Sequence, residues 1–212
     1  MIHRDLKPGN VLVDGEGRPK VIDFGIARSV EREPDSTELT IAGQVVGTLQ
    51  YMAPEQLDTD TDAVDTRADV HALGLLLFEL LAEEPARRLT ATSLAQAARQ
   101  VADETIPRLD RACPELPRDL AWITLRAAER EVERRYSTVP ELAADVRRFL
   151  AFEPVAAGPP SVVYRLSKFV RRNRVAVFAA GAILVTAIVA SIAVLTRLAE
   201  ERRLHLQMER LA

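Results

Sequence analysis

The order of hydrophobic and polar residues predicts three kinds of element along the 212-residue chain. The stretch VLVDGEGRPKVI holds two short β-branched runs around a Gly-rich connection, which predicts a β-hairpin over residues 11–22. Thr138 followed by Glu141 has the spacing of a capping box and predicts a helix that begins there. Helical spacing also relates Leu73, Leu76, Leu77, Leu80 and Leu81, which are therefore expected on the buried face of a core helix.

The longest apolar run is Val175 to Leu195, which contains no charged residue. Its 21 residues, at a rise of about 1.5 Å per residue, span a bilayer core of roughly 30 Å. The run therefore predicts one transmembrane helix over residues 175–195. Beyond it, Leu204, Met208 and Leu211 keep helical spacing, so residues 196–212 are expected to begin an extracytoplasmic helix or coiled coil.

The region before the apolar run, residues 151–174, changes in composition. EPVAAGPPS, residues 153–161, is typical of an extended linker, and YRLSKFVRRNR, residues 164–174, places five cationic residues at one membrane edge. Residues 1–160 carry 19 Lys and Arg against 28 Asp and Glu, whereas residues 161–212 carry 9 against 3. Because the basic residues flank an apolar segment, the lipid bilayer and not a nucleic acid is the expected partner.

Two further residue types bear on assembly and compartment. The small-residue row Ala182, Thr186 and Ala190 would let two membrane helices approach, so a homodimer is an open expectation, although such rows also arise by composition. Cys113 is the single cysteine, which excludes an intramolecular disulfide and indicates a reduced, intracellular lobe.

Candidate chemistry is concentrated at the start of the chain, in HRDLKPGN (residues 3–10) and VIDFG (residues 21–25). Phosphoryl transfer from ATP needs a carboxylate at the acceptor hydroxyl and oxygen ligands for a divalent cation. Asp5 would orient the hydroxyl, Lys7 would contact the transferring phosphate, and Asn10 with Asp23 would hold Mg²⁺ or Mn²⁺. Either tripeptide alone occurs by chance; their order and spacing around the predicted hairpin indicate a shared cleft.

These two segments resemble the catalytic loop and the metal-binding motif of Ser/Thr protein kinases, of the bacterial, membrane-anchored, eukaryotic-like group. The resemblance covers residues 1–150 and implies an incomplete, mainly α C-terminal lobe of an α+β kinase fold, with a small hairpin at the catalytic loop. Lys7, two positions after Asp5, is typical of Ser/Thr specificity. ATP, a divalent metal and protein substrates are the implied ligands. Further residues that match family positions, as structural or regulatory groups, are His3, Arg4, Phe24, Gly25, Thr48, Glu55, Asp69 and Arg135.

Several of these positions have specific implied roles. Thr48 would face the substrate, Asp69 would bond the catalytic-loop backbone, and Glu55 of the Ala53-Pro54-Glu55 motif would pair with Arg135. The Glu55–Arg135 pair would be structural even in a working enzyme. A phosphate on Ser36, Thr37 or Thr40 could pair with Arg4, although loop hydroxyls are usually only solvated.

The sequence also departs from the family pattern. A Gly-rich loop, a strand lysine and a helix glutamate normally precede the catalytic loop, so the chain as written is expected to be a truncated, inactive form. Residues 82–93 read AEEPARRLTATS where a T-G-x-x-P-F-like turn is expected. The expected function is membrane-anchored Ser/Thr kinase signalling, with the lobe cytoplasmic in a single-pass cell-membrane protein. The alternative is a non-catalytic, membrane-tethered, kinase-like interaction module.

Overall fold

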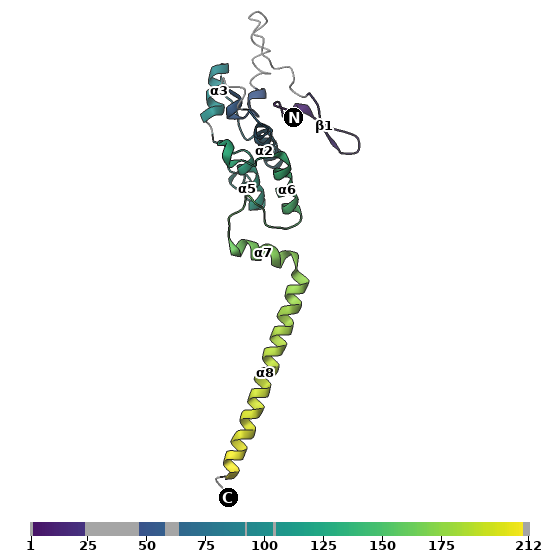
Figure 1. Ribbon diagram of the computed structural model, residues 1–212, viewed down its shortest axis with the longest axis vertical. Helices are drawn as coiled ribbons and strands as arrows, with labels where there is room; N and C mark the ends of the chain where they lie inside the picture. The colour runs from purple at the N-terminus through teal and green to yellow at the C-terminus, as the bar shows by residue number, and fades with distance from the viewer. Residues whose placement is uncertain (1, 24–46, 58–63, 92, 104, 210–212) are drawn as a thin grey trace, which may run out of the picture. The chain divides into compact units, whose positions relative to one another are not determined.

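The computed structural model describes residues 2–23, 47–57, 64–91, 93–103 and 105–209, with side chains as far as Arg197. Contacts divide the chain into two compact units, Met1–Pro160 and Ser161–Ala212. The first unit is mainly helical and carries one two-stranded sheet, and the second consists of two helices (Figure 1). This agrees with the mainly α fold and the small sheet expected from the sequence.

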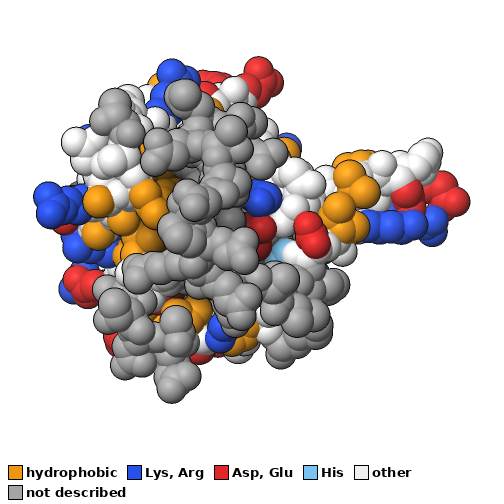
Figure 2. Space-filling model, turned by 90° about the horizontal axis from the view of Figure 1, so that it is seen from above, with side chains coloured by type: hydrophobic (Ala, Val, Ile, Leu, Met, Phe, Trp, Pro, Cys, Tyr) orange, Lys and Arg blue, Asp and Glu red, His pale blue; other side chains and the backbone are white. Residues whose placement is uncertain are grey.

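The hairpin forms as the β-branched runs predict. Strands β1 (Val11–Val13) and β2 (Pro19–Val21) pair antiparallel, with Val11 opposite Val21. In the turn, the Asp14 carboxylate accepts the backbone N–H of Arg18 at 2.9 Å and forms an ion pair with its side chain. Figure 2 shows the hairpin projecting to the right, with charged side chains at its tip and apolar ones nearer the body. A short helical turn, η1 (Pro8–Asn10), leads from the catalytic loop into β1.

The core of the first unit is built on helix α2 (Arg67–Ala82), which packs against α5 (Arg118–Ala127) and α6 (Val139–Leu150). Gly74 permits the closest approach, because a Cβ built there would lie 2.8 Å from the Cβ of Ala127 and 2.8 Å from the backbone N of Ala128. Buried side chains then fill the interface, namely Leu75, Phe78, Ala86, Leu109, Leu120, Ala121 and Ala128.

The predicted buried face of α2 was partly wrong. Leu80 is 78% exposed, and Leu73, Leu76, Leu77 and Leu81 are only half-buried. Leu80 lies five positions after Leu75, about 140° around the helix, so it points away from α5. The close contact at Gly74, which leucine spacing alone does not reveal, sets which face of α2 is buried.

Four shorter elements lie in the described part of this unit. They are η2 (Pro54–Leu57), α3 (Leu94–Asp103), α4 (Leu109–Ala112) and η4 (Val132–Arg134). Ala97 and Val101 of α3 form a second buried cluster with Leu49, and Met52 and Leu57 pack against it. This cluster supports residues 48–57 from one side.

The last helix of the first unit, α6, begins at the predicted cap. Thr138 Oγ1 accepts the N–H of Glu141 at 3.3 Å, which confirms the cap, while the Glu141 carboxylate accepts the N–H of Ser137, one residue before the expected partner. The fully buried Asp145 carboxylate accepts the N–H groups of Ala156 and Ala157 at 2.6 and 2.9 Å. Residues 156–157, expected as an extended linker, are therefore bound to α6.

The second unit contains α7 (Val162–Arg172) and α8 (Arg174–Glu209). Residues 164–172, expected as part of a basic juxtamembrane linker, lie within helix α7. Within α8, the stretch Arg174–Arg197 is long and apolar enough to cross a membrane. Helix α8 continues without interruption through the predicted extension as far as Glu209.

Candidate active site

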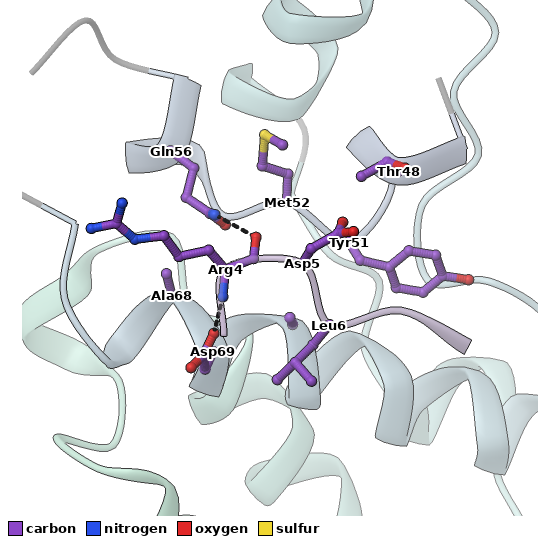
Figure 3. A pocket seen from close by; sticks show the side chains of 10 residues that line it. Arg4, Asp5, Leu6, Thr48, Tyr51, Met52, Gln56, Ala68 and Asp69 are labelled. Atoms are coloured by element: carbon purple, nitrogen blue, oxygen red, sulfur yellow. Dashed lines mark hydrogen bonds between the residues drawn. The ribbon is translucent and has the colours of Figure 1, made fainter. Parts of the chain in front are cut away.

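The catalytic loop has no regular hydrogen-bonded structure at residues 3–7 and depends on α2 for its geometry. Asp69, buried in the first turn of α2, accepts the backbone N–H of His3 at 2.8 Å and that of Arg4 at 2.9 Å. Arg4 adopts a φ of 67°, a left-handed conformation that costs a non-glycine residue about 1–3 kcal/mol. The two bonds to one carboxylate hold this strained backbone in place, and Figure 3 shows the one from Arg4.

A second side chain, Gln56, holds the backbone of Arg4 on the side opposite Asp69. Its amide nitrogen donates to the carbonyl of Arg4 at 2.9 Å, and its amide oxygen accepts the N–H of Ala53 at 3.0 Å. Gln56 thereby joins the catalytic loop to the segment that carries Glu55 (Figure 3). Between loop, segment and α2 lies a cavity of about 10 Å³, roughly the space that one water molecule needs.

The polar centre of the site is the Asp5 carboxylate. Its Oδ2 accepts hydrogen bonds from Lys7 Nζ at 3.0 Å and from Asn10 Nδ2 at 3.1 Å. Asn10 Nδ2 also donates to the Asp5 carbonyl at 2.7 Å. One carboxylate is therefore fixed between an ammonium group and an amide, close to the protein surface.

Lys7 extends this centre toward Thr48. Its ammonium group donates to Thr48 Oγ1 at 3.1 Å, although the two residues are 41 positions apart. Thr48 is buried, whereas the Lys7 side chain is 27% exposed. An acceptor hydroxyl placed at Asp5 would thus also lie near Lys7 and Thr48.

The hairpin joins the backbone of Asn10 to that of Ile22, the residue before the second metal-binding candidate, Asp23. The N–H of Ile22 donates to the carbonyl of Asn10 at 2.9 Å, and the His3 ring nitrogen Nε2 lies 3.1 Å from the carbonyl of Ile22. Asp23 follows directly, is exposed, and has a left-handed φ of 62°. Phe24 and Gly25 lie outside the described residues, as do Ser36, Thr37 and Thr40.

This donor set fits a hard divalent cation. Asn10 uses its amide nitrogen on Asp5, which leaves its amide oxygen as the atom that would bind a metal. Asp23 would supply an exposed carboxylate, and Mg²⁺ commonly takes one or two protein ligands plus phosphate oxygens and water. Among the described residues, no group of three or more His, Cys, Asp or Glu side chains is placed so that it could hold a metal ion without further ligands.

The Glu55–Arg135 pair lies apart from the chemistry. Arg135 is fully buried in the core, and its guanidinium forms two hydrogen bonds with the Glu55 carboxylate, one of them 2.8 Å long. The same guanidinium donates to the carbonyls of Arg67 at 3.1 Å and Arg130 at 3.0 Å. It therefore links η2, α2 and the segment before α6 in one network.

Sequence reasoning missed two residues that shape the site, Gln56 and Arg87. Arg87 is 2% exposed, and its Nη1 donates to the carbonyls of Met52 at 3.2 Å and Gln50 at 3.4 Å. It lies in the segment, residues 82–93, whose sequence departs from the family turn. Gln56 had no comparable signal beyond its place next to Glu55.

Comparison with known proteins shows which family this chain belongs to. The protein kinase domain family matches residues 1–142, about two thirds of the chain, so the chain belongs to the protein kinase family. Serine/threonine-protein kinase PknB of Mycobacterium tuberculosis is 40% identical over 158 residues, which cover 74% of this chain and 24% of that protein. The protein of the same name from Mycobacterium leprae is 38% identical over 157 residues, with the same coverage.

A third relative is the probable serine/threonine-protein kinase PknB of Bifidobacterium longum. It is 36% identical over 158 residues, which cover 74% of this chain and 22% of that protein. The aligned region therefore spans about a quarter of the relatives' length.

Proposed function

We propose that this chain carries the catalytic region of a Ser/Thr protein kinase, which transfers the γ-phosphoryl group of ATP to a protein hydroxyl. The observation that carries the proposal is the cluster in which Asp5 accepts from Lys7 and Asn10 while Lys7 also donates to Thr48. It provides a carboxylate, a cation and an amide where an acceptor hydroxyl and a phosphate would meet.

In this mechanism the acceptor hydroxyl hydrogen-bonds to Asp5, which takes its proton as the new oxygen–phosphorus bond forms and the bond to ADP breaks. Lys7 neutralises charge on the transferring phosphoryl group. Asn10 and Asp23 would hold the divalent metal, which, when bound, neutralises charge on the nucleotide phosphates. Asp69 and Gln56 act through backbone groups and are positioning residues.

The test uses a chimera in which the N-terminal kinase lobe of the Mycobacterium tuberculosis relative precedes Ile2 of this chain. Transfer of labelled phosphate to a generic basic protein is expected. Asp5→Asn should lower kcat about 10²- to 10⁴-fold, the usual contribution of a positioned acid–base group. Asp23→Asn should also lower turnover, but excess Mn²⁺ should partly restore it, because the defect lies in metal binding.

The matched control is Asp110→Asn, which removes a half-buried carboxylate of α4 that pairs with Arg108 and should leave turnover unchanged. Equal responses of the Asp5 and Asp23 variants to Mn²⁺ would contradict the separate roles. Absence of transfer in the unmodified chimera, with the relative's own intact domain active, would favour the non-catalytic interaction module.

We further propose that Arg174–Arg197 anchors the protein in the cell membrane as a single span, with the kinase lobe cytoplasmic. The support is the length and apolar composition of this stretch. No part of its most apolar window is buried in the structure. A phosphatase reporter fused after Ala212 should be active outside the cell, and one fused after Pro160 should be silent. A silent reporter after Ala212 would contradict this topology.

A homodimer through α8 remains a proposal. Thr186 donates its hydroxyl to the Ala182 carbonyl at 2.9 Å, so within one helix that hydroxyl is already used. Any association along this row would therefore depend on close packing of small side chains.

A further inference from the structure

Helix α7 is a separate element with its own caps. Ser161 Oγ accepts the N–H of Tyr164 at 3.4 Å at its start, and at its end Asn173 leaves the helical conformation with φ −111° and ψ 39°. The Asn173 side chain donates to the Phe169 carbonyl at 3.1 Å. Only Asn173 separates α7 from α8, so α7 is a distinct helix held directly next to the proposed membrane span.

The apolar side chains of α7 form one exposed stripe. Their spacing of i, i+1, i+4, i+7 and i+8 places them within about 120° of the helix circumference. All five are solvent-exposed in the structure: Val162 by 79%, Val163 by 77%, Leu166 by 59%, Phe169 by 51% and Val170 by 39%. A stripe of this kind, uncovered by protein, is the side that would enter a lipid boundary.

The opposite side of α7 is cationic. Arg165, Lys168, Arg171 and Arg172 occupy the arc away from the stripe, and the three arginines are exposed. Lys168 is buried, and its ammonium group lies 5.7 Å from the centre of the Tyr164 ring. The sequence contains no acidic residue between Glu153 and Glu200, so the charged residues of α7 itself are all cationic.

The corner between α7 and α8 adds a second, independent feature. An open hollow of about 350 Å³ is lined there by Arg171, Arg172 and Arg174, together with Asn173, Val175 and Ala176. Guanidinium groups suit phosphate oxygens, and the two apolar residues beside them begin the apolar helix. The hollow therefore combines the two chemistries of a phospholipid, an anionic headgroup and an acyl chain.

We propose that α7 lies in the surface of an anionic bilayer, with its apolar stripe among the acyl chains and anionic headgroups at the Arg171–Arg172–Arg174 corner. This inference rests on the proposed membrane span. An acidic protein groove would suit the same charges, but α7 is joined to the apolar helix through one residue, which keeps the stripe within reach of the lipid surface. The bilayer is therefore the occupant that charge and connectivity favour.

The test reconstitutes the full chain, with Cys113→Ser, into lipid nanodiscs made of phosphatidylcholine with phosphatidylglycerol. A single nitroxide label is introduced through Leu166→Cys in the stripe, Arg165→Cys on the cationic side, or Ile188→Cys within α8. Accessibility to oxygen, which concentrates in lipid, is compared with accessibility to a water-soluble nickel chelate. The label at 166 should be protected from the chelate, whereas the label at 165 should not.

The three labels separate the two proposals. A label at 188 that is open to the chelate would refute the span itself. A label at 188 in lipid together with a label at 166 in water would overturn the α7 proposal alone. Equal accessibility of the labels at 165 and 166 would also overturn it, because the stripe would then have no preferred side.

The charge requirement is tested with the combined variant Arg171→Gln, Arg172→Gln and Arg174→Gln. Loss of three cationic groups near an anionic surface should weaken lipid contact of the label at 166 on the order of 100-fold in equilibrium constant. Nanodiscs of phosphatidylcholine alone should reproduce this loss in the unmodified chain. Unchanged protection of the label under both conditions would show that anionic lipid plays no part.

Discussion

The Arg135 guanidinium and the Glu55 carboxylate are 80 positions apart and meet in a two-pronged ion pair. The arginine side chain is fully buried and the glutamate side chain is 12% exposed. The same arginine donates to three backbone carbonyls, those of Arg67, Glu129 and Arg130. One side chain therefore satisfies groups from three segments of the chain.

Arg135→Lys should lower the free energy of unfolding of the first unit by about 3 kcal/mol. This is in the range measured when a buried ion pair is broken, and lysine cannot reproduce the geometry of the guanidinium. A lysine keeps the charge but cannot form two parallel bonds to Glu55 and reach the carbonyls as well. Denaturant unfolding of the chain in detergent measures the change. The control is Arg134→Lys, because Arg134 forms an exposed ion pair with Glu131 and its loss should have little effect.

Gly74→Ala should destabilise the same unit by about 1–3 kcal/mol. The added methyl group would lie 2.8 Å from the Ala127 Cβ, so α2 and α5 would have to move apart. Gly15→Ala is the matched change, since no atom lies within 4 Å of its added methyl group. Equal unfolding midpoints for the two variants would contradict the close packing of α2 on α5.

Glu83→Gly should stabilise the protein by about 0.5–1 kcal/mol. Glu83 ends α2 with a left-handed φ of 57°, a conformation that glycine adopts without strain. The control is Glu84→Gly at the next position. This change removes an exposed ion pair with Arg88 and relieves no backbone strain. Thermal unfolding should therefore move up for the first variant and not for the second.

Stability should depend on pH through His71. Burial, aided by the positive charges of Arg135 and Arg87, lowers the pKa of His71 well below its ordinary 6.5. The unfolded chain then binds a proton that the folded chain does not, so stability is complete above pH 6.5 and falls as the pH drops below it. The slope should reach about 1.4 kcal/mol per pH unit.

His71→Gln removes this group and should flatten the dependence between pH 6.5 and about 5, whatever it does to stability at neutral pH. Urea unfolding at several pH values measures both slopes. An unchanged slope in the variant would assign the dependence to another group.

Asp145→Asn should loosen the segment after α6. Although burial alone would raise the pKa of Asp145, hydrogen bonds from Ala156, Tyr136, Ala157 and Arg148 lower it below 3.8. Its contribution to stability is therefore present above pH 3.8 and lost as the pH falls further. At neutral pH the variant should be cut by elastase near Ala156 and Ala157 well before the parent, whereas Asp110→Asn should not.

The hairpin, the start of α6 and the apolar helix could be predicted because each depends on local pattern. β-Branched runs around glycines, a cap with a glutamate three residues later and an uncharged run of 21 residues all act within a few turns of chain. These features need no knowledge of what packs against them. The motif spacing predicted a cleft shared by Asp5 and Asp23, whereas the contacts of Asp5 with Lys7 and Asn10 come from the structure.

The remaining features depend on contacts between distant segments. Leucine spacing predicted Leu80 as core, but the approach of α5 at Gly74 selects another face of α2. The roles of Gln56, Arg87 and Asp145 each arise from backbone groups elsewhere in the fold, which a one-dimensional pattern does not contain. Helix α7 was missed because its 11 residues follow a Pro-rich stretch and their charges dominated the interpretation.

The two hydrogen bonds that the catalytic loop donates to Asp69 also bear on how the site opens in solution. The amides of His3 and Arg4 exchange with deuterium when their bonds to the Asp69 carboxylate in the first turn of α2 break. Their exchange rates should therefore follow the opening of a helix more than sixty residues away in the chain. The loop that carries Asp5 and the helix that carries Asp69 are then expected to open as one cooperative unit.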